Sequence, residues 1–234
     1  MADISAIHRL FARKPPPEAL LPVDELRLTS GPGALVSFPD PFPPVPAMLA
    51  TRLQLELLLG ERLIDLKAVS TVILRDPGAT LQVLRLFGTE HGTAPMRPMR
   101  MENCLAGLEA RMWLEAVCSA TLEISAETPE ICAAWTHARE IARYAMSLAE
   151  TTEGYSPEEA CIVGLLHELE DLPALLGWER KLFPAAASAA RMASAWNLPR
   201  CLVLCSETPE ESDRYWHKLL GEAHRRLMRS HKVA

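Results

Sequence analysis

Two histidines and two carboxylates within one stretch of the chain are the residues best suited to chemistry. His137 and His167 each lie on a predicted helix. Glu168 directly follows the second histidine, and Asp171 lies four residues after it, on the same predicted helical face. Neutral imidazole and carboxylate groups bind transition metals, and a bound metal can turn water into a nucleophile at neutral pH. These residue types therefore raise the question of a metal-dependent hydrolytic site.

The number of potential ligands argues against such a site. A hydrolytic metal needs roughly three or more protein ligands and an open place for water. His137, His167 and Glu168 supply three at most, and Asp171 has a simpler function as the N-cap of a short helix around Pro173. We therefore expect partly buried histidines that satisfy each other by hydrogen bonds, with no catalytic residue, no bound metal and no cofactor. A working metal site remains the alternative.

Two predicted helices position the histidines. The first helix carries apolar residues at a spacing of three to four, which marks one buried face beside His137. The second begins at Ser156-Pro157-Glu158-Glu159, a pattern that supplies an N-cap hydroxyl, a proline at the first helical position and a carboxylate in the first turn. A tight loop around Gly154 joins the two helices. The sequence therefore predicts that His137 and His167 share one pocket.

The composition favours a helical protein that does not cross a membrane. The chain has 234 residues, of which 49% are hydrophobic and only 6% aromatic. Its net charge of −6 disfavours non-specific binding to nucleic acid. The six cysteines include no C-x-x-C pair, which is typical of buried thiols in a reducing compartment. With neither a signal peptide nor an apolar run of membrane-spanning length, the protein is expected to be soluble and cytoplasmic.

The chain is predicted to be all-α, with a two-lobed helical bundle between an arm and a terminal helix. Residues 1–38 form the arm, residues 39–207 the domain, with lobes at about 46–122 and 129–204, and residues 208–234 an amphipathic helix packed on it. That last helix has Tyr215, Leu219 and Ala223 on one face and several basic residues on the others. The basic residues complement the helix dipole or, alternatively, bind an anionic partner.

Several of these segments resemble one known family. The helix with Trp135-Thr136-His137, followed by the helix ending Gly164-Leu165-Leu166-His167-Glu168, looks like the HD superfamily of metal-dependent phosphohydrolases and more closely like its HDOD branch. The proline-rich segment before residue 46, and the later Arg75-Asp76-Pro77, are similar to the opening of HDOD domains. The resemblance implies an all-helical bacterial regulatory module, most relatives of which have lost the hydrolase metal site.

The chain departs from the hydrolase pattern where a metal would bind. In HD hydrolases an aspartate directly follows the second histidine, whereas this chain has Glu168. Later family histidines are replaced around Cys205, Ser206 and Glu207. The resemblance therefore implies a non-catalytic signalling protein that acts through a protein partner or a small-molecule or nucleotide ligand, with His137, His167, Glu168 and Asp171 lining a vestigial pocket. The alternative is a divergent phosphohydrolase acting on a nucleotide or cyclic dinucleotide.

Overall fold

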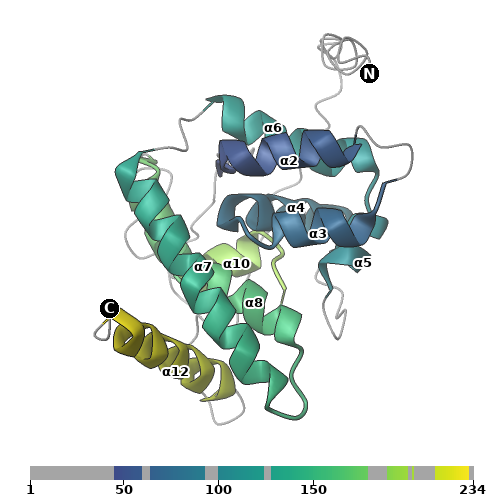
Figure 1. Cartoon of the computed structure of the whole chain (residues 1–234). Coiled ribbons are helices and arrows are strands. Elements are labelled where there is room, and N and C mark those ends of the chain that lie inside the picture. The colour runs from purple at the N-terminus through teal and green to yellow at the C-terminus, as the bar shows by residue number, and fades with distance from the viewer. Residues whose placement is uncertain are drawn as a thin grey trace, which may run out of the picture. The chain divides into compact units, whose positions relative to one another are not determined.

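A computed structural model describes residues 45–59, 64–92, 100–123, 128–178, 189–199, 202 and 214–231 of the chain. Helices and the turns between them account for these residues, and no strand occurs among them (Figure 1). The predicted all-α, two-lobed fold is confirmed. None of the described helices combines the length and the apolar character needed to span a bilayer.

The first group of helices comprises α2 (Leu49–Leu59), α3 (Leu66–Ile73), α4 (Pro77–His91), α5 (Met101–Ala106) and α6 (Ala110–Glu123). Two of them begin at an aspartate that acts as the N-cap. Asp65 caps α3 by accepting hydrogen bonds from two backbone amides, and Asp76 does the same for α4 ahead of Pro77. Within this group α4 packs on α6 and α5, and α3 packs on α5 and α2.

Two glycines set helix boundaries in this group. α4 continues through Gly88 to His91 and ends at Gly92, whose φ of 70° stops it. Gly107 is the C-cap of α5 and separates it from α6.

The second group comprises α7 (Pro129–Glu150), α8 (Pro157–Leu165), the 3-10 turn η1 (Leu169–Asp171), α9 (Leu172–Leu175), α10 (Ala189–Ala195) and α12 (Arg214–His231). Thr128 and Ser156 cap α7 and α8 through their hydroxyls, and each is followed by proline. The Ser156 start agrees with the sequence prediction. Residues 208–213, at the start of the predicted C-terminal helix, lie outside the described residues.

α7 and α8 form an antiparallel hairpin, which Figure 1 shows clearly. Gly154 in the connecting turn has a φ of 86°, a conformation that residues with a Cβ adopt only with strain. Gly164 then lets the two backbones come close, because a Cβ there would meet the Cα of Ala142 at 2.5 Å. This close approach fixes the end of α8 against the middle of α7.

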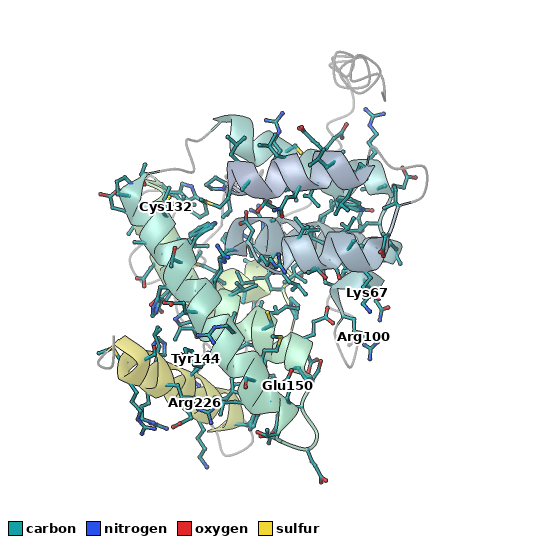
Figure 2. All side chains as sticks on the ribbon, in the orientation of Figure 1. Lys67, Arg100, Cys132, Tyr144, Glu150 and Arg226 are labelled. Atoms are coloured by element: carbon teal, nitrogen blue, oxygen red, sulfur yellow. The ribbon has the colours of Figure 1, made fainter. Side chains whose placement is uncertain are left out.

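α12 packs on both helices of this hairpin. Leu219, Ala223 and Leu227 are buried along one face, while Arg225 and Arg226 are exposed and pair with Glu222. The Tyr155 ring before α8 stacks on Tyr215 of α12. Figure 2 shows Arg226 on α12 and Tyr144 on the neighbouring stretch of α7.

A buried carboxylate joins the two groups of helices. Besides capping α4, Asp76 accepts a hydrogen bond from the backbone amide of Met48 at 2.7 Å and one from the indole of Trp135 on α7 at 3.2 Å. These donors satisfy the carboxylate, although burial raises its pKa. The cap of α4 therefore also holds the N-terminal end of α7.

Candidate histidine cluster and adjacent pocket

His167 lies in the turn that follows α8 rather than on the helix, because α8 ends at Leu165. Its Nδ1 is 2.8 Å from the carbonyl oxygen of Gly164. A carbonyl only accepts hydrogen bonds, so Nδ1 carries the proton and the neutral ring leaves a lone pair on Nε2. The side chain is only 6% exposed, and that Nε2 has no hydrogen-bond partner. A buried nitrogen without a partner is costly, which marks this atom as unusual.

His137 and Glu168 lie close to the Nε2 atom of His167. Glu168 Oε1 lies 3.4 Å from His137 Nε2 and 3.5 Å from His167 Nε2. His137 projects from α7 and is 34% exposed, whereas Glu168 is 44% exposed. The structure thus brings together three of the four residues that the sequence indicated as candidates.

A third histidine, which sequence reasoning missed, completes the cluster. His224 on α12 places its ring centroid 5.0 Å from that of His167 and 5.3 Å from that of His137. One ligand nitrogen from each of the three histidines lies within 4.8 Å of the other two. The available signal was its position four residues after Leu220 and three before Leu227, which puts it beside the apolar face of the helix.

Asp171 lies apart from the histidine cluster. The sequence placed it on the same helical face as His167, but the helix ends before either residue, and Asp171 closes the 3-10 turn η1 instead. It occupies the N-cap position of α9, as predicted, although its side chain makes no capping hydrogen bond. It lines a neighbouring pocket together with Glu168.

The charges in the cluster favour a cation. Contact with His167 holds the pKa of Glu168 below the usual carboxyl value, with partial burial acting in the opposite direction. Burial lowers the pKa of His224, and His167 and His137 lower it further, while Glu168 opposes this effect. The cluster therefore presents an ionised Glu168 carboxylate beside the His224 imidazole, whose protonation is disfavoured by burial and by the two neighbouring histidines.

The neighbouring pocket has a volume of about 240 Å³ and a mostly apolar wall. Val45 and Pro77 contribute from the first group of helices, and the second group supplies the rest. The second group's apolar lining residues are Ala134, Trp135, Ala138, Leu165, Leu166, Leu169, Leu172 and Leu175. Glu168 and Asp171 are the charged residues of this wall, so Glu168 belongs both to the pocket and to the histidine cluster.

The family model for the HDOD domain matches residues 43–182, which is more than half of the chain. The chain belongs to the HDOD family. The matched range contains His137, His167, Glu168 and Asp171, but it ends before α12, so His224 is contributed from outside it. No curated protein matches the sequence significantly.

Two crystal structures of the MmoQ response regulator from Methylococcus capsulatus strain Bath resemble this HDOD protein in fold. Each is 17% identical to it and covers 78% of this chain. The superpositions have TM-scores of 0.58 and 0.60 and cover 83% and 85% of the MmoQ chains, respectively. At this identity, the likeness establishes the helical architecture alone.

The residues of the histidine cluster fit a metal ion in a way that the sequence did not show. The HD hydrolases that it resembles hold their metal with histidine and aspartate, and here the aspartate is replaced by Glu168. The buried, unpartnered Nε2 of His167 nevertheless faces a carboxylate oxygen and another imidazole nitrogen. Three nitrogens and one oxygen suit a borderline ion such as Zn²⁺ better than Mg²⁺, which prefers oxygen ligands.

Proposed function

We propose that this HDOD protein is a non-catalytic regulator in signal transduction that senses a small ligand in the pocket beside the histidine cluster. Membership of the HDOD family supports a regulatory role, and the MmoQ proteins that share its fold are named response regulators. The pocket, which is lined by described residues, is concave and has a mostly apolar wall. Small-molecule sites usually have this character.

The observation that carries this proposal is the composition of the pocket wall. Val45 precedes α2 and Pro77 begins α4 in the first group of helices, whereas Trp135 and Leu165 belong to the hairpin of the second. A ligand in contact with both sides stabilises one packing of the two groups over others, because it binds that packing more tightly. Binding of the ligand would thereby change the surface that a partner protein contacts.

The wall also limits the chemistry of the ligand. A volume of about 240 Å³ lies below the roughly 300–1,000 Å³ typical of drug-sized ligands, so the ligand is small. Its body is apolar, because leucine, alanine and tryptophan form most of the wall. Glu168 and Asp171 favour a cationic or hydrogen-bond-donating end group and disfavour an anion.

Calorimetry with three matched probes tests this proposal. Phenethylamine carries the amine, 2-phenylethanol is its neutral counterpart, and 3-phenylpropionate is the anion. We expect affinity to fall in that order with the full chain in the presence of EDTA. Ala138→Leu fills the pocket and should weaken binding of the amine by at least about 10-fold, whereas Ala133→Leu, on the exposed side of the same helix, should not. Equal binding by both variants, or no binding of the amine, would contradict the assigned pocket.

A divergent phosphohydrolase is the second candidate, and the convergence of three histidines and Glu168 is the observation that favours it. We rank it lower because a hydrolytic metal keeps a place open for water. Here three imidazoles and one carboxylate suffice to fill the four places of a tetrahedral ion, which is typical of a structural site. Assays of phosphodiester turnover decide between the two candidates.

A further inference from the structure

Three separate elements, one of them distant along the chain from the other two, each contribute one histidine to a single point. His137 comes from α7, His167 from the turn after α8, and His224 from α12. Their ligand nitrogens lie within 4.8 Å of one another, and the rings of each pair are tilted rather than stacked. Packing alone does not require three imidazoles at one point, since apolar side chains fill such a space at lower cost.

We infer that His137, His167 and His224 bind one Zn²⁺-class transition-metal ion, with Glu168 as the fourth ligand, and that this ion fastens α12 to the α7–α8 hairpin. The site differs from the metal site of the HD hydrolases in its ligands, because one comes from the helix beyond the family domain. His137, His167 and Glu168 supply three ligands, and His224 raises the number to four.

The distances in the cluster already approach those of a tetrahedral ion. With metal–ligand bonds of about 2.0–2.1 Å, two ligand atoms of a tetrahedron are about 3.3 Å apart. Glu168 Oε1 lies 3.4 Å and 3.5 Å from the Nε2 atoms of His137 and His167. These separations are long for hydrogen bonds and close to the edge of that tetrahedron. Small rotations of the half-exposed His224 side chain complete the set.

His167 is prepared for binding by its second nitrogen. The Nδ1–H group donates a hydrogen bond to the Gly164 carbonyl. This bond fixes the ring orientation and leaves the Nε2 lone pair for the ion. Gly164 in turn is held against Ala142 by the close contact between α7 and α8. A backbone carbonyl that orients a ligating histidine is the usual support of a metal site.

A metal at this point links the position of α12 to metal availability. Without the ion, α12 is held by its apolar face, including Leu219 and Ala223, and by the Tyr155–Tyr215 stack. With the ion, a ligand bond near the middle of the helix adds to that contact and exists only in the docked state. The inference goes beyond ligand sensing and does not depend on what the adjacent pocket binds.

Metal content and a melting curve test the inference on the full chain, purified without a chelator or a metal-affinity step. After dialysis against Zn²⁺ we expect one zinc per chain, and EDTA should lower the melting temperature reversibly. Co²⁺ in place of Zn²⁺ should give the visible absorption of a four-coordinate site. Failure of the wild-type protein to retain stoichiometric Zn²⁺ or Co²⁺ would overturn the inference.

Variants on α12 show whether the helix supplies a ligand. His224→Ala should weaken Zn²⁺ binding by more than about 100-fold, since removal of a direct ligand exceeds the effect of removing an outer partner. His217→Ala removes a histidine two turns earlier on the same helix and should leave binding unchanged. Equal zinc affinity in both variants would overturn the assignment of His224. If His224→Ala folds poorly, His224→Gln, which keeps a side chain of similar size without the imidazole, provides the same test.

Hydrogen–deuterium exchange measures the predicted effect on α12. Chelation should speed exchange of the amides in α12 of the wild-type protein, because the helix loses one of its attachments. The same comparison in His224→Ala should show no change on chelation. Exchange in the wild-type helix that does not respond to Zn²⁺ would overturn the fastening of α12 while leaving metal binding to be judged by the stoichiometry.

Discussion

The ring of His224 lies nearly edge-on to the ring of His167, with 5.0 Å between their centroids and 65° between their planes. The two residues belong to α12 and to the turn after α8, and only α12 packing brings them together. The cluster is therefore a set of three histidines that converge on one point, rather than a remnant pair.

We expect His167→Ala to destabilise the protein even when no metal is present. The side chain is almost fully buried and its Nδ1 donates to the Gly164 carbonyl, so the change leaves both a cavity and an unpaired acceptor. The cost should be about 2–4 kcal/mol. Urea unfolding in EDTA measures it, and His137→Ala, which removes a half-exposed ring, should cost clearly less.

Gly164→Ala tests the close contact of the hairpin. The added Cβ would meet the Ala142 backbone at 2.5 Å, so α7 and α8 must separate, and we expect a loss of about 2 kcal/mol or more. Gly221→Ala is the matched control on α12, where only the tip of Arg225 lies near the added atom at 3.8 Å. That change should stabilise the helix by about 0.5–1 kcal/mol. Similar effects of the two substitutions would show that the hairpin tolerates a side chain.

The C-terminal helix offers a contrast between its two faces. Leu219 is 4% exposed, so Leu219→Asp buries an unpaired carboxylate and should lower the melting temperature strongly. Arg225 and Arg226 contact only Glu222 among the ion pairs described, and exposed pairs contribute little. Replacing both arginines with alanine should therefore leave the melting temperature nearly unchanged. A large loss in the double variant would mean that this face is not solvated.

Asp76→Asn tests the junction between the two groups of helices. The carboxylate accepts hydrogen bonds from backbone amides on both of its oxygens and from the Trp135 indole. An asparagine amide would direct its own N–H groups at some of these donors, and we expect a loss of about 2–3 kcal/mol. Chemical unfolding gives the loss, and the fluorescence of Trp135 should change because its indole loses its acceptor. A neutral substitution would show that the junction does not depend on this carboxylate.

Local sequence patterns predicted the helices well because their causes are local. The Thr128, Ser156 and Asp76 caps each act on amides two or three residues away, and the apolar spacing in α7 is a property of that helix alone. The fold class followed from these patterns and is confirmed. The end of α8 before His167 did not follow, because the turn there depends on where Gly164 meets Ala142.

Only part of the candidate site could be predicted from the sequence. His137, His167 and Glu168 were found because α7 and α8 are neighbours along the chain, so the hairpin brings α7 close to the turn that follows α8. His224 could not be placed, since the sequence does not specify which surface α12 covers. The limits of the arm, the domain and the terminal helix stay predictions, and residues 1–38 lie outside the described part of the chain.

The rate of phosphodiester hydrolysis tests the claim of a non-catalytic regulator most directly. The full chain is loaded in turn with Mg²⁺, Mn²⁺, Fe²⁺ or Zn²⁺ and given bis(p-nitrophenyl) phosphate or a cyclic dinucleotide, with His167→Ala prepared in parallel. The account predicts that the wild-type rate equals that of His167→Ala with every metal, because the four ligands leave no place for an attacking water. Turnover by the wild-type protein that disappears in His167→Ala would contradict it and identify a hydrolase.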